Sequence, residues 1–131
     1  RGEMQKATEH RRTVLVLDDD EILRRSVSRI LQLQGYEVIE AQDAHEAFAI
    51  LDEHSEPIGA VLCDLVLPGL GGREAANTIL ARHPDVRLLF TSGYSGNDSG
   101  RQELIDRSAP FLSKPFDVPE LLSAVDALFA T

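Results

Sequence analysis

The stretch Val14-Leu15-Val16-Leu17-Asp18-Asp19-Asp20 decides the fold, because a continuous apolar run ends abruptly in three acids. An apolar run without alternation is typical of a strand buried on both faces of a parallel sheet. Apolar residues then recur at helical spacing, at Ile22, Val27, Ile30 and Leu31, and Gly35 stands where a helix commonly ends. The stretch therefore predicts a strand followed by a helix.

The same alternation continues to the end of the chain. Further strands are expected over residues 36–41, 58–65, 87–91 and 110–113, and helices over 43–51, 72–83, 102–107 and 117–129. Acids followed three positions later by Glu, at Asp43 and Asp117, favour helix starts there. Five strand–helix units predict a three-layer, flavodoxin-like α/β domain with a parallel sheet in the order 2-1-3-4-5.

Composition narrows the class of protein. The 131 residues suit one domain, expected over residues 13–131 after a polar linker or tail at 1–12. A net charge of −9 disfavours a nucleic-acid groove, and a single cysteine excludes an internal disulfide. The sequence contains no apolar run long enough for a bilayer span, so no membrane contact and a cytoplasmic location are expected. The start at Arg1 suggests a piece of a longer protein.

Polar side chains stand where the predicted strands end: Asp18, Asp19, Asp64, Ser92 and Lys114. In an open parallel sheet these ends form the ligand crevice, where the strand order reverses. Carboxylates crowded together need a cation, and a hard ion such as Mg²⁺ prefers oxygen ligands. The pattern suits phosphoryl transfer onto an aspartate.

The chain closely resembles the receiver domain of two-component response regulators. The motifs that carry the resemblance are VLVLDDDE (14–21), CDLVLPGLGG (63–72), LLFTSGY (88–94) and FLSKPF (111–116). The FTSGY run looks most like receivers of hybrid sensor histidine kinases. A stand-alone regulator and the front half of a longer regulator remain alternatives.

The resemblance implies a role for each matching position. Asp64 would accept the phosphoryl group, Asp18, Asp19 and the backbone carbonyl of Val66 would complete a Mg²⁺ (or Mn²⁺) site with it, and Lys114 and Ser92 would assist catalysis. Ser92 and Phe111 would act as the switch, and the Lys114–Pro115 bond would be cis. Asp20 is expected to cap a helix, Cys63 to face the core, and the four histidines to lie on the surface.

The function expected is that of a phosphoacceptor in a phosphorelay. The donor would be a phosphohistidine on a histidine kinase or a phosphotransfer protein, and a homodimer is possible. Self-catalysed phosphoryl transfer and autodephosphorylation are expected, rather than turnover as an enzyme. Two alternatives are an aspartate-nucleophile phosphohydrolase, which would need an acid where Val66 stands, and a receiver-like binding module that is not phosphorylated.

Overall fold

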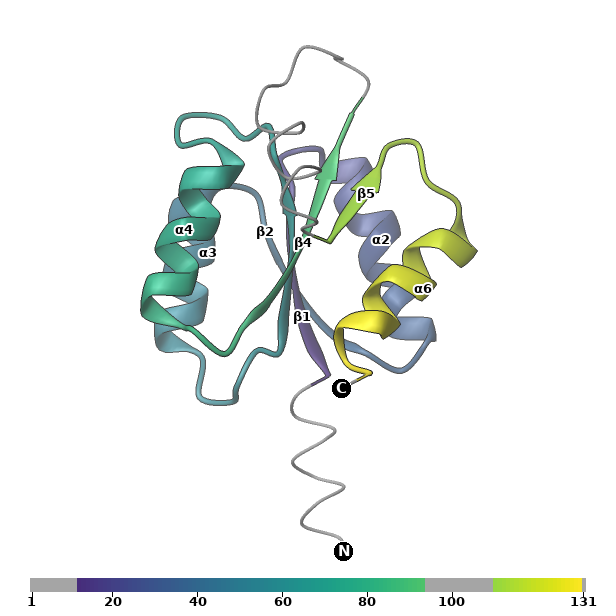
Figure 1. Cartoon of the computed structure of the whole chain (residues 1–131), viewed down its shortest axis with the longest axis horizontal. Helices are drawn as coiled ribbons and strands as arrows, with labels where there is room; N and C mark the ends of the chain where they lie inside the picture. The colour runs from purple at the N-terminus through teal and green to yellow at the C-terminus, as the bar shows by residue number, and fades with distance from the viewer. Residues whose placement is uncertain (1–11, 94–109, 131) are drawn as a thin grey trace, which may run out of the picture.

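A five-stranded parallel sheet lies between two layers of helices. The computed structural model describes residues 12–93 and 110–130. The strands follow the order β2-β1-β3-β4-β5; their bounds are β1 Thr13–Leu17, β2 Glu37–Ala41, β3 Ala60–Asp64, β4 Arg87–Ser92 and β5 Phe111–Ser113. The helices are α2 Glu21–Leu33, α3 Ala44–Glu53, α4 Gly72–Arg82 and α6 Val118–Leu128. Figure 1 shows α3 and α4 over one face of the sheet and α2 and α6 over the other. The predicted class and strand order are confirmed.

The sheet divides the core in two, because side chains alternate along each strand. Leu15 and Leu17 of β1 face the α3–α4 layer, whereas Val14 and Val16 face the α2–α6 layer. All five residues of β1 are buried, as the uninterrupted apolar run predicts. Cys63 lies in the α3–α4 core with no exposed surface, so its predicted packing role is confirmed.

The predicted helix starts are stabilised by acidic caps. The backbone N–H of Leu23 donates to Asp20 (3.2 Å) and that of Glu46 donates to Asp43 (2.8 Å). At α6, Asp117 and Glu120 exchange reciprocal bonds of 2.8 and 3.1 Å, which complete a capping box. These bonds satisfy N–H groups that a helix start leaves without a partner.

The observed elements differ from the expected ones in small ways. Strand and helix bounds move by one or two residues at several ends. Ile22 was expected on the apolar stripe of α2 but is 81% exposed, whereas Ser28 is buried there and donates to the Arg24 carbonyl. The expected helix at 102–107 and residues 1–11 of the linker expected over 1–12 lie outside the described residues.

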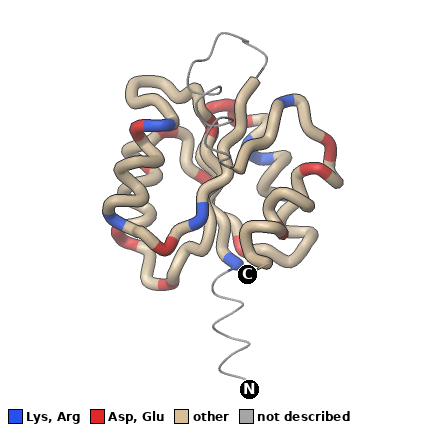
Figure 2. The backbone as a smooth tube through the Cα atoms, in the orientation of Figure 1, with Lys and Arg blue, Asp and Glu red and all other residues tan. Residues whose placement is uncertain are grey.

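Charge is spread over the described part of the chain. Figure 2 shows basic positions in both helical layers, interspersed with acidic ones. None of the described helices is long and apolar enough to cross a bilayer.

Candidate functional site

The carboxyl ends of β1 and β3 bring three acids together. The two strands are paired, with Leu17 beside Cys63, so the residues that follow, Asp18 and Asp64, are neighbours. Both are buried, at 5% and 6% exposure, whereas Asp19 beside them is exposed. One carboxylate oxygen of each of the three lies within 4.8 Å of the others. The convergence expected from the strand order is therefore present.

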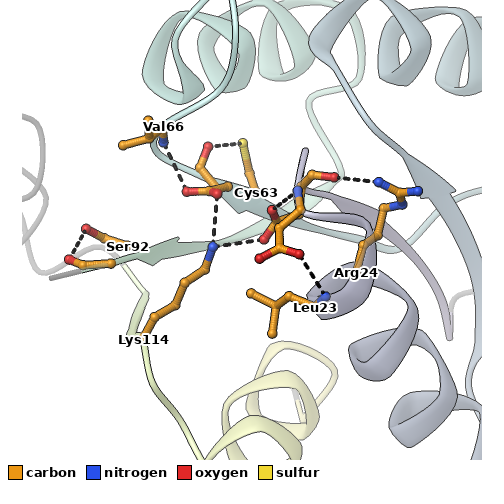
Figure 3. A network of polar contacts seen from close by, with 10 residues as sticks. Leu23, Arg24, Cys63, Val66, Ser92 and Lys114 are labelled. Atoms are coloured by element: carbon orange, nitrogen blue, oxygen red, sulfur yellow. Dashed lines mark hydrogen bonds and ion pairs between the residues drawn. The ribbon is translucent and has the colours of Figure 1, made fainter. Parts of the chain in front are cut away.

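Lys114 reaches this cluster from the end of β5. Its Nζ lies 2.9 Å from Asp18 Oδ2 and 2.9 Å from Asp64 Oδ2, so one ammonium bridges two carboxylates (Figure 3). The peptide bond between Lys114 and Pro115 is cis, as the resemblance implies. Residues from opposite ends of the chain thus meet at the carboxyl ends of the strands.

The second oxygen of each buried carboxylate accepts a backbone hydrogen bond. Asp18 Oδ1 accepts from the N–H of Asp20 (2.9 Å), and Asp64 Oδ1 accepts from the N–H of Val66 (3.0 Å). Arg24 Nη1 donates to the Asp18 carbonyl (3.0 Å), while its Nε pairs with Glu40 (2.9 Å). The two backbone bonds orient the carboxylates, and Arg24 holds the main chain at Asp18. No signal in the sequence predicts this role of Arg24.

The buried part of the cluster, Asp18, Asp64 and Lys114, carries one more negative charge than positive charge. Burial raises the pKa of Asp64, and the charge of Asp18 adds to this; together they outweigh the bonds from Val66 and Lys114. Burial alone would lower the pKa of Lys114, but its hydrogen bonds and attraction to Asp18 and Asp64 raise it overall. The ammonium therefore stays charged, whereas ionising Asp64 costs free energy that a bound cation would offset.

The donor set fits a hard divalent cation. Three carboxylates offer oxygen ligands: Asp18 and Asp64 are buried and oriented, and Asp19 is exposed to solvent. Val66 is 57% exposed, and its backbone N–H donates to Asp64. Its carbonyl remains a predicted ligand.

Ser92 adjoins the cluster through the backbone, because the Lys114 N–H donates to the Ser92 carbonyl (2.7 Å). Ser92 is buried at the end of β4, and its hydroxyl donates to the Gly93 carbonyl (3.3 Å), directed away from Lys114 in Figure 3. Phe111 pairs with Phe90 across β4 and β5 and packs against the α3–α4 core. Their switch roles remain predictions.

Gly72 makes a contact that sequence reasoning missed. The first residue of α4 lies so close to the end of β3 that a Cβ there would stand 2.2 Å from the Asp64 carbonyl oxygen and 2.6 Å from Leu65 Cα. Its N–H donates to the Leu65 carbonyl (3.0 Å). The paired glycines 71 and 72 were the available signal, although a glycine pair indicates equally well a turn.

An open cleft adjoins the cluster on the α2–α6 side. It has a volume of about 350 Å³ and is lined by Asp20, Leu23, Lys114, Pro115 and Phe116. Apolar side chains therefore lie directly beside the charged centre, on the side from which Lys114 enters.

Known proteins resemble the chain in sequence and in fold. Residues 14–126 match the response regulator receiver domain family. The chain is 34% identical over 113 residues to the sensor kinase CckA of Brucella abortus, covering 86% of this chain and 12% of that protein. It is 34% identical over 121 residues to the CAI-1 autoinducer sensor kinase/phosphatase CqsS of Vibrio cholerae, covering 90% of this chain and 17% of that protein.

A short relative and a solved structure resemble the chain over nearly their whole length. The response regulator receiver protein CpdR of B. abortus is 29% identical, with 88% of this chain and 94% of that protein covered. The crystal structure of the receiver domain of NtrX from B. abortus superposes with a TM-score of 0.80 at 30% identity, covering 90% of this chain and 98% of that one. With its sheet order, its acidic cluster and this match, the chain belongs to the family of response regulator receiver domains.

Proposed function

We propose that Asp64 is the phosphoacceptor of this receiver domain. The observation that carries the proposal is the position of Lys114, whose single ammonium lies 2.9 Å from both Asp64 and Asp18 at the mouth of the acidic cluster. Asp64 Oδ1 is held by the Val66 N–H, so the carboxylate is oriented before any donor arrives. A carboxylate oxygen of Asp64 would form the new bond to phosphorus as the bond to the donor nitrogen breaks.

Asp18, Asp19 and Asp64, with the carbonyl of Val66, are the residues that would hold Mg²⁺ or Mn²⁺. When bound, such an ion would neutralise the excess negative charge of the cluster and that of the incoming phosphoryl group. Lys114 would contact a phosphoryl oxygen, and Ser92 would have to rotate from the Gly93 carbonyl to donate to another. Phe111 would then repack beside it, and hydrolysis of the acyl phosphate would return the resting state.

The direct test is intact mass after incubation with Mg²⁺ and acetyl phosphate. The native chain and the control Asp52→Asn, an acid at the opposite end of the molecule, should gain one phosphoryl group, and Asp64→Asn should gain none. Chelation of the metal with EDTA should abolish the gain. Labelling that survives Asp64→Asn would refute the assignment, and inertness of the native chain with Mg²⁺ bound would favour a binding module.

The alternative of a phosphohydrolase is disfavoured by the residue two positions after Asp64. A fast hydrolase would need an acid or base there to handle the proton of the attacking water. Val66 supplies an exposed apolar side chain instead. Sustained release of phosphate from a generic phosphomonoester would nevertheless establish that reaction.

We propose that the phosphodonor protein docks against the first turn of α2. Ile22 is 81% exposed at that turn, beside the cleft that Leu23, Pro115 and Phe116 line. An exposed isoleucine gains free energy when a partner covers it, about 1.5–3 kcal/mol if burial is complete. The fitting partner is a histidine kinase or a phosphotransfer protein, which places its phosphohistidine over Asp64.

The chain offers a matched control for this docking. Leu33 is 78% exposed at the far end of the same helix. Ile22→Asp should slow transfer from a phosphohistidine protein at least about tenfold, whereas Leu33→Asp should leave it within about twofold. Neither should change labelling by acetyl phosphate. Equal slowing by both variants would refute the docking site and leave Asp64 as acceptor untouched.

A further inference from the structure

The first described residue, Arg12, contacts Tyr36, which in turn contacts the end of α6. Its guanidinium lies 4.5 Å from the centre of the Tyr36 ring, and its carbonyl accepts the Glu37 N–H (3.3 Å). The Tyr36 hydroxyl donates to Asp126 of α6, and the Tyr36 and Phe129 rings pack with centroids 5.4 Å apart. Figure 1 shows the start of β1 and the end of α6 at the same end of the sheet.

Tyr36, which all these side chains contact, is buried, whereas Arg12, Asp126 and Phe129 are partly or fully exposed. Tyr36 is 4% exposed, so its hydroxyl depends on Asp126 and Arg12 for polar partners. Burial and the hydrogen bond to Asp126 raise the pKa of Tyr36 to about 12. The Arg12 Nε is buried without a hydrogen bond among the described residues.

We propose that Arg12, Tyr36, Asp126 and Phe129 form a terminal latch that ties the chain entering β1 to the last turn of α6. The latch would couple two movements. A displacement of α6 would change the direction of the backbone at Arg12, and a change in that direction would displace α6. The same helix starts four residues after Lys114. The inference does not depend on phosphorylation of Asp64 and is tested without a phosphodonor.

Hydrogen exchange at the Glu37 amide tests the latch, because this amide donates to the Arg12 carbonyl and does not itself bond Asp126. Tyr36→Phe and Asp126→Ala should each speed its exchange at least about fivefold relative to the Val16 amide of the central strand. Ser123→Ala, an exposed change on the same helix, should stay within about twofold. An unchanged Glu37 amide in both latch variants would overturn the proposal.

A double-mutant cycle provides a second measurement. The combined effect of Arg12→Ala and Asp126→Ala on the unfolding equilibrium constant should differ from the product of their separate effects by roughly fivefold, because both residues act on Tyr36. The cycle repeated with Tyr36→Phe should lose this coupling. Effects that multiply within about twofold in the native background would refute a latch.

Discussion

Two ionic clusters lie at opposite ends of the sheet, and the nitrogen–oxygen distances within them are the same. At the carboxyl end, Lys114 lies 2.9 Å from Asp18 and from Asp64; at the amino end, Asp52 lies 2.9 Å from Arg82 and from His83. The side chains of the first cluster are 19%, 7% and 7% exposed, whereas Asp52, Arg82 and His83 are 44%, 50% and 28% exposed.

The comparison teaches that burial and charge balance, rather than distance, decide what an ion pair does. Water and salt screen the exposed cluster, so its contacts contribute little to stability. The buried cluster interacts in a medium of lower dielectric, and it carries two carboxylates for one ammonium. An unbalanced buried cluster costs free energy, which is typical of a site that binds an ion or a charged group.

The largest effect should come from filling the contact at Gly72. Gly72→Ala should destabilise the fold by about 3 kcal/mol or more, because the new Cβ would overlap the backbone at Asp64 and Leu65. Gly71→Ala is the matched control, since a Cβ there meets nothing within 4 Å. Urea denaturation of both variants measures the difference, and equal stabilities would show that α4 can shift away from β3.

The next effect should separate the two clusters directly. Lys114→Met keeps most of the side-chain volume but leaves two buried carboxylates without their ammonium, at a cost of about 2 kcal/mol. Arg82→Met removes a cation at the same distance from its acid and should cost about 0.5 kcal/mol. Chemical denaturation without divalent ions tests both, and a reversed order would break the comparison.

Asp64→Asn should stabilise the fold in the absence of divalent ions, by about 1 kcal/mol at neutral pH. Because the folded-state pKa of Asp64 is raised, the native chain loses stability as the pH rises through that pKa, and the variant does not. The difference should therefore vanish in acid. Mg²⁺ should stabilise the native chain and narrow the gap; a gap independent of pH would contradict the raised pKa.

The smallest effect should follow Asp52→Ala, which removes both contacts of the exposed cluster. Its cost should stay below about 1 kcal/mol and shrink between low and high salt, as expected for screened charges. Denaturation in about 0.05 M and 0.5 M salt measures this. A cost that grows with salt would mean that packing of Arg82 against the Phe48 ring (5.4 Å), rather than charge, dominates at this end.

The sequence predicted most of what depends on local pattern. Apolar runs located the strands, and the acids Asp20, Asp43 and Asp117 marked three helix starts that the structure confirms. The meeting of Asp18, Asp64 and Lys114 followed from strand order alone. Their roles in phosphoryl transfer remain predictions.

Features that depend on three-dimensional packing were not predictable. Ile22 matched the helical spacing, yet it lies at the first turn of α2, where the sheet does not reach it. The orientation of the Ser92 hydroxyl depends on a local backbone acceptor, and the approach of Gly72 depends on how α4 docks. His83 was expected to be a solvated residue, but its Nε2 lies 2.9 Å from Asp52.

The edge strand β2 has a consequence for association between molecules. Its sequence, Glu-Val-Ile-Glu-Ala, places Glu37 and Glu40 on the outermost strand of the described sheet. A second copy pairing its own β2 there would bring carboxylates against carboxylates. Edge charges of this kind oppose strand addition, and β5 at the other edge is only three residues long. The sheet is therefore protected against edge-to-edge aggregation at high concentration.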